Sequence, residues 1–151
     1  MTLTELVLYF EKNIENFDKT NPNVSNSTVA WQIDHSLKVI NNVCKVLIKS
    51  DPDDYQWKFN FYRSTTLPLN YFPRGKVKAP KGVRPEYDMP AKETLTQAIA
   101  DAKSLLKRIE NLPENSNFKH PIFGLLNLKT SKRFLKVHSY HHYKIIREIL
   151  S

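Results

Sequence analysis

The sequence predicts an all-α fold, a four-helix bundle with one long loop, and three observations favour it. The 151 residues fit a single domain, 1–151. Apolar residues make up 40% and charged residues 25%, which is typical of a globular protein. Apolar side chains recur at three- and four-residue steps in four segments, which are residues 3–17, 28–49, 92–111 and 130–150.

The first two predicted helices have clear start and stop signals. Thr2 and Glu5 form a T-x-x-E capping box at the start of the first, and a line of apolar residues follows it. The second takes Ser27 as its N-cap and ends before Asp51-Pro52, because a residue before proline is biased away from helix. Its apolar stripe consists of Ile33, Leu37, Ile40, Cys44 and Leu47.

The last two predicted helices are also amphipathic. The third, residues 92–111, is expected to bury a side rich in Leu, Ile and Ala and to expose its charged side. The fourth, residues 130–150, takes Thr130 as its N-cap. One line along this helix consists of Phe134, His138, Ile145 and Ile149.

A long connection, residues 51–91, separates the second and third helices and holds six of the nine prolines. We expect a short helical piece at residues 54–63 and irregular but packed chain over 64–90. A connection of this length in a small domain is usually functional or a sign of a wrong element assignment, and we take it to be functional.

The positive charge is concentrated in that connection. No Asp or Glu lies between Tyr55 and Pro85, and seven Lys or Arg residues there nearly equal the net charge of +8. Three interpretations stay open: a solvated basic surface, cations that attract an anionic substrate to a pocket, and a surface where aromatic residues stack on nucleic-acid bases. Arg63 and Arg74 are the candidate substrate-binding residues, because guanidinium suits a carboxylate or phosphate.

The single cysteine, Cys44, excludes an internal disulfide and any cysteine-based zinc motif. Its place on the apolar stripe predicts a core residue. The N-terminus does not resemble a signal peptide, and no apolar run reaches membrane-spanning length. We therefore expect a cytoplasmic protein.

Histidine placement predicts a metal site. His138 and His142 are four residues apart, so their imidazoles share one helix face, the face expected to point inward. His35, on the edge of the second helix's apolar face, is the third candidate. Three neutral nitrogen ligands with open positions are typical of catalytic zinc sites.

Other interpretations of the histidines stay open. Paired histidines on a helix often only hydrogen-bond to backbone or water. Helix rotation decides whether His141 or His142 points inward. His120, in the loop before Pro121, is expected to be structural, in a turn or as a donor to a ligand.

Three features together resemble the DinB/YfiT-like superfamily of proposed metalloenzymes: His35 after Trp31, HPIFG at 120–124, and HSYHH at 138–142. The stretch LPLNYFPRGKVKAPKGVRP, residues 67–85, is similar to the proline-rich basic loop of its DUF1569 branch. The resemblance covers residues 29–149.

The resemblance implies a bundle with up-down-down-up helix order and a divalent metal, usually zinc or nickel, held by His35, His138 and His142. It also implies thiol-dependent transferase or isomerase chemistry with a low-molecular-weight thiol, although many members have no assigned reaction. Relatives often have Gln three residues after the last ligand, where this chain has Ile145.

The functional prediction is a metal-dependent transferase or hydrolase that acts on a small anionic substrate, with no catalytic residue assigned. The alternative is a DinB-like scaffold for binding or the stress response, without turnover. We expect neither nucleic acid nor a membrane as a partner, and a homodimer stays open.

Overall fold

The structure, a computed structural model, describes residues 1–69, 72, 81–85 and 89–151. These residues are mostly helical, with one small antiparallel sheet. No helix among them combines the length and the apolar character that a membrane span requires. The elements are α1 (Leu3–Lys12), α2 (Val29–Lys49), α3 (Phe61–Leu69), α4 (Lys92–Arg108), β1 (Asn117–His120), β2 (Gly124–Asn127) and α5 (Leu128–Ile149).

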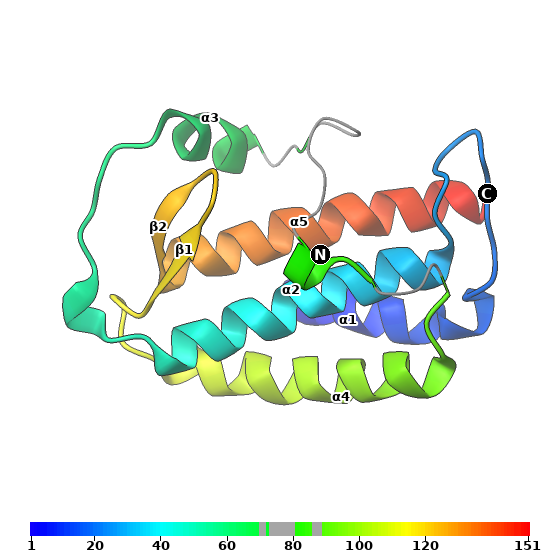
Figure 1. Cartoon of the computed structure of the whole chain (residues 1–151), viewed down its shortest axis with the longest axis horizontal. Coiled ribbons are helices and arrows are strands. Elements are labelled where there is room, and N and C mark those ends of the chain that lie inside the picture. The colour runs from blue at the N-terminus through cyan, green and yellow to red at the C-terminus, as the bar shows by residue number, and fades with distance from the viewer. Residues whose placement is uncertain (70–71, 73–80, 86–88) are drawn as a thin grey trace.

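Four of the helices pack side by side, and α3 lies outside them. Both α1 and α2 contact α4 and α5. In Figure 1, α1 and α5 run toward the side that carries the C-terminus, whereas α2 and α4 run the opposite way. The sheet and α3 lie at the far end, beside the first turns of α5. This arrangement places the first half of α2 against the middle of α5.

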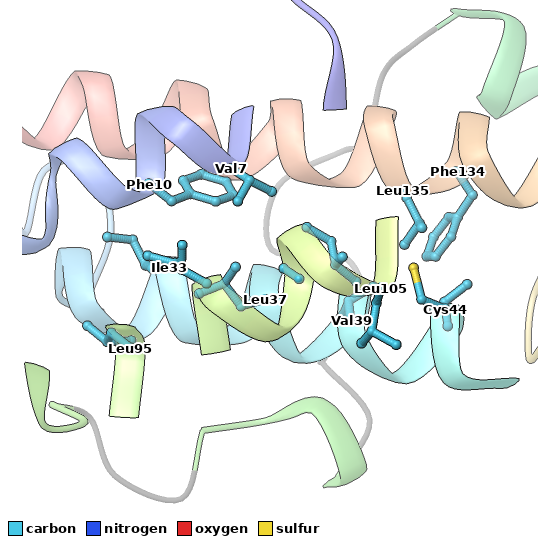
Figure 2. Close-up of a cluster of buried hydrophobic side chains, with 14 of the residues drawn as sticks. Val7, Phe10, Ile33, Leu37, Val39, Cys44, Leu95, Leu105, Phe134 and Leu135 are labelled. Carbon is cyan, nitrogen blue, oxygen red and sulfur yellow. The ribbon is translucent and has the colours of Figure 1, made fainter. Parts of the chain in front are cut away.

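The core fills the space between these helices with the predicted apolar faces. Phe10 of α1, Leu37 of α2, Leu95 of α4 and Leu135 of α5 are fully buried, and Figure 2 shows them among their neighbours. Cys44 is fully buried in the same cluster, and burial raises the pKa of its thiol to about 12. The prediction that Cys44 is a core residue is confirmed.

Helix ends follow side-chain capping more closely than apolar periodicity. The capping box of Thr2 and Glu5 is present. However, α1 ends at Lys12, where the predicted helix ran to residue 17, and a 3-10 turn, η1 (Ile14–Asn16), follows it. Asn13 lies at this change of helix type, and its side chain donates a hydrogen bond to the Tyr9 carbonyl across 2.8 Å.

Two predicted N-caps are wrong by one and three residues. Thr28, not Ser27, caps α2, because its Oγ1 accepts from the backbone N–H of Trp31 at 3.1 Å. Asn127, not Thr130, caps α5, and its Oδ1 accepts from the Thr130 N–H at 3.0 Å. In each case the residue that offers an oxygen to the first free amides sets the helix start.

The long connection differs from the prediction. Its helix is α3, at residues 61–69, instead of 54–63, with a 3-10 turn η2 (Pro52–Asp54) before it. Asn60 sets the start of α3, since its Oδ1 accepts from the Arg63 N–H at 2.8 Å. A further 3-10 turn, η3 (Lys81–Val83), lies against α2. The stretch 64–90 is therefore partly helical.

The hairpin of β1 and β2 is absent from the predicted elements. His120 pairs with Gly124, and Asn117 pairs with Asn127, around a turn that contains Pro121. Gly124 has φ +71°, a backbone conformation that favours glycine. The Pro and Gly of the HPIFG string thus serve a tight turn.

Candidate metal centre

Helices α2 and α5 bring His35, His138 and His142 together. The two helices pack against each other, and His138 and His142 lie one turn apart on α5. One ligand nitrogen from each of the three lies within 4.8 Å of the others. The ring centroids are 5.0 Å apart for His35 and His138, 4.9 Å for His35 and His142, and 4.6 Å for His138 and His142.

This spacing suits a divalent ion. The Nε2 atoms of His35 and His138 are 3.2 Å apart. Two nitrogens that each lie about 2.0–2.1 Å from a tetrahedral zinc ion are about 3.3 Å from each other. A small shift of the third imidazole would therefore complete a three-nitrogen site.

His142 is oriented by Gln32, which lies on α2 and is itself buried. The Nδ1 of His142 lies 2.6 Å from the Gln32 side-chain oxygen Oε1. Because that oxygen only accepts, Nδ1 carries the proton, and Nε2 keeps its lone pair. The Gln32 amide nitrogen in turn donates to Ser25 Oγ at 3.2 Å, which fixes which end of the amide faces the histidine.

His35 is oriented in the same way by the backbone. Its Nδ1 donates to the carbonyl of Val83 across 2.7 Å, so its Nε2 also faces the other histidines as a lone pair. The adjacent Gly82 carbonyl accepts from the Asn42 amide at 3.3 Å. The long connection therefore contributes a backbone atom next to the candidate ligands.

Of the three histidines, His138 is the one with a buried ring nitrogen that lacks a hydrogen-bond partner among the described residues. Its Nε2 donates to His35 Nε2, while its Nδ1 is buried with no hydrogen-bond partner among the described residues. A buried polar atom without a partner costs about 1–3 kcal/mol. His138 therefore carries its ring proton on Nε2 in the metal-free chain, and coordination of an ion through that nitrogen would move the proton to Nδ1.

All three imidazoles are held in the neutral form that metal binding requires. Burial is the main cause and lowers the pKa of each. The neighbouring histidines lower the pKa of His138 and His142 further. For His35, the hydrogen bond to Val83 and the charge of Asp34 partly oppose this effect.

Aromatic side chains line the cluster. Trp31 stacks on His35 with ring centroids 5.1 Å apart. Phe134 lies beside His138 at 5.7 Å. The ring of Phe72, from the long connection, contacts both His138 and His141 at about 6 Å. The ligand nitrogens that converge are those of His35, His138 and His142, so His142, not His141, is the second α5 residue of the cluster, which answers the question that the sequence left open.

His120 has the structural role expected of it, in a turn. Its Nδ1 accepts from the backbone N–H groups of Ile122 and Phe123, both at 3.1 Å. Its ring stacks on Phe123 with centroids 4.5 Å apart. Burial lowers its pKa to about 4, so this acceptor is unprotonated at neutral pH.

Arg63 makes hydrogen bonds to backbone carbonyls of the protein itself. Its guanidinium is buried and donates to the carbonyls of Lys58, Phe123 and Leu125, so it ties α3 to the hairpin. A role of Arg63 in substrate binding stays a prediction, and it would compete with these bonds. Arg74 lies outside the described residues.

The sequence interpretation missed the two groups that orient the ligands. Gln32 precedes His35 by three residues, so it lies one helical turn away on the same face. That spacing, with Trp31 beside it, is the only local signal for its role. Nothing in the sequence marks the Val83 carbonyl, since any residue offers one.

A comparison with protein families finds a match over this fold and site. The model described as the DinB superfamily matches residues 15–146, which include all three histidines. No match was found among curated proteins or among solved structures.

Proposed function

Because the chain belongs to the DinB superfamily and unites three neutral histidines, we propose that it is a metal-dependent enzyme of the DUF1569 branch. The helix pairs in contact and their directions in Figure 1 support the up-down-down-up four-helix bundle of that superfamily. The convergence of His35, His138 and His142 carries the proposal.

The proposed ligands are the Nε2 atoms of these three histidines, and zinc or nickel is the proposed ion. A bound divalent ion would act as a Lewis acid that lowers the pKa of a coordinated water or thiol. Gln32 and the Val83 carbonyl hold two of the ligand rings in the correct tautomer. Trp31, Phe72 and Phe134 limit the access of water to the site.

We propose transferase or hydrolase chemistry on a small anionic substrate, with a low-molecular-weight thiol as a further cofactor. The acid-free stretch 55–85 supports an anionic substrate, because its cations raise the local concentration of anions. Arg63 and Arg74 remain the proposed substrate-binding residues. A reducing cytoplasm is the proposed location, since such a thiol remains reduced there.

Metal analysis of protein purified without a histidine tag tests the site. We expect about one zinc or nickel ion per chain, and we expect His138→Ala to lose the ion while its circular dichroism spectrum is unchanged. His141→Ala, next to the cluster, is the matched control and should keep the ion. A wild-type protein that binds neither ion, even after incubation with both, would contradict the proposal.

The metal-loaded protein then distinguishes an enzyme from a scaffold. A thermal-shift screen with small thiols and carboxylates should find a ligand whose effect disappears in His138→Ala. Turnover of a thiol-dependent substrate would support the enzyme. Metal binding without any ligand or turnover would favour the non-catalytic scaffold.

A further inference from the structure

One end of the molecule exposes an unusual number of large apolar side chains. We call residues 55–69 the aromatic segment; it comprises an extended stretch, 55–60, and α3. Five of its large apolar side chains are at least 61% exposed, although such residues are usually covered. They are Trp57 at 67%, Phe59 at 69%, Phe61 at 65%, Tyr62 at 61% and Leu69 at 73%.

The aromatic segment is anchored through its other side chains. Leu67 is buried, and Arg63 is bound to the hairpin carbonyls. Asn60 donates to the Ile122 carbonyl at 3.0 Å, and Arg133 of α5 donates to the Leu67 carbonyl at 3.0 Å. Because polar contacts and one leucine hold the segment, four of its aromatic side chains are left facing solvent. Figure 1 shows α3 beyond the hairpin, outside the packed helices.

The elements that anchor the segment are cationic. Between Glu114 and Glu148 the sequence has no acid and seven Lys or Arg residues, and this span includes the hairpin and almost all of α5. Lys119, Lys129 and Lys136 are exposed there, and Lys58 is exposed within the aromatic segment itself. On the N-terminal side of the aromatic segment, the nearest acids in the sequence are Asp51, Asp53 and Asp54, at the start of the connection.

The opposite side of the molecule neutralises its charges internally. Lys103 of α4 pairs with Glu11 of α1 at 2.7 Å, and Lys92 pairs with Glu15 at 2.8 Å. Among the described residues, the excess of Lys and Arg over Asp and Glu lies chiefly on the side of α3, the hairpin and α5. A second copy of the chain would present the same cations to this side, so self-association through it is electrostatically unfavourable.

A bilayer surface that contains anionic lipids fits these features. Trp and Tyr favour the headgroup region, Phe and Leu reach the acyl boundary, and lysines attract anionic headgroups. The exposure of the aliphatic Leu69 favours this partner over single-stranded nucleic acid, which uses aromatic stacking and not aliphatic contact. We propose that the aromatic segment, with the lysines beside it, docks the protein peripherally on anionic lipid bilayers.

This proposal is independent of the metal site. It replaces the expectation that no membrane is a partner, which rested on the lack of a long apolar run and so bears only on a spanning helix. Docking through the aromatic segment needs no such helix.

Co-sedimentation of the full chain with vesicles tests the proposal. We expect binding to vesicles of equal parts phosphatidylcholine and phosphatidylglycerol, weak binding to phosphatidylcholine alone, and a loss of binding as salt is raised. Phe59→Ser with Phe61→Ser should weaken binding by about tenfold or more, because both rings leave water on docking. Leu8→Ser with Val46→Ser, at sites on α1 and α2 that are 40% and 44% exposed, is the control and should not change binding.

Two further measurements make the test specific. Trp57 emission should shift to the blue with anionic vesicles. Trp57→Phe should abolish the shift, which would show that the shift does not arise from Trp31. Lys129→Glu with Lys136→Glu should reduce binding, whereas Lys107→Glu on α4 should not. The proposal is overturned by no vesicle binding, by equal binding to both vesicle types, by binding to oligothymidylate instead of vesicles, or by a dimer that buries Trp57.

Discussion

His142 Nδ1 and Gln32 Oε1 lie 2.6 Å apart, and both side chains are buried where α5 meets α2. The hydrogen bond joins a candidate ligand to the helix that supplies the third ligand, His35. It fixes the proton on Nδ1 and so directs the His142 lone pair toward the other two histidines. The site therefore depends on a residue that is not itself a ligand.

Replacement of Gln32 should weaken metal binding without loss of the ligands. Gln32→Leu removes the acceptor, so we expect zinc affinity to fall about 10–100-fold. Gln32→Glu keeps an oxygen acceptor and should retain most of the affinity. Competition with a chromophoric chelator measures both, and Gln97→Leu on the exposed face of α4 is the control. Equal affinities in wild type and Gln32→Leu would show that Gln32 does not position His142.

Arg63 should matter for stability more than for substrate affinity. Arg63→Met keeps the length of the side chain but leaves the carbonyls of Phe123 and Leu125 without their donor. We expect a loss of about 1–3 kcal/mol in the free energy of unfolding, measured by urea denaturation. Lys58→Met, at an exposed neighbouring position, should change it by less than about 0.5 kcal/mol. An unchanged stability in Arg63→Met would favour the substrate-binding role.

The hairpin turn should need glycine at position 124. With φ +71°, Gly124→Ala places a Cβ in a left-handed conformation and should destabilise the protein by about 1–2 kcal/mol. Gly82→Ala is the matched comparison, since its Cβ would have open space and its φ lies outside that region. We expect Gly82→Ala to be neutral or slightly stabilising. Equal melting temperatures for the two variants would contradict this account of the turn.

His120 should make the metal-free protein sensitive to acid. Its pKa is about 4 in the folded chain and 6.5 in its ordinary state, so below about pH 6.5 the unfolded chain binds the proton first. The free energy of unfolding should be highest above that pH and should fall as the pH drops toward 4. His120→Asn, which keeps a turn acceptor, should show a smaller fall in urea denaturation with chelator present. An identical pH dependence in the wild type and His120→Asn would exclude His120 as a cause of the acid sensitivity.

Much of the fold follows from local patterns, because each long helix carries its own apolar face. The pair His138 and His142 follows likewise from the four-residue helical spacing. The hairpin does not, since its strands have four residues each and neither alternates clearly. Gln32 and Val83 acquire their roles only once α2, α5 and η3 pack together. A single sequence contains no signal for the Val83 carbonyl, and for Gln32 only its three-residue spacing from His35.

X-ray absorption at the metal edge of the zinc-loaded protein measures directly whether three histidines bind one ion. We expect three imidazole nitrogens at about 2.0–2.1 Å in the wild type, and one fewer in His35→Ala. Oxygen or nitrogen neighbours without the multiple-scattering features of imidazole, a sulfur ligand, or an identical spectrum for His35→Ala would contradict the three-histidine site.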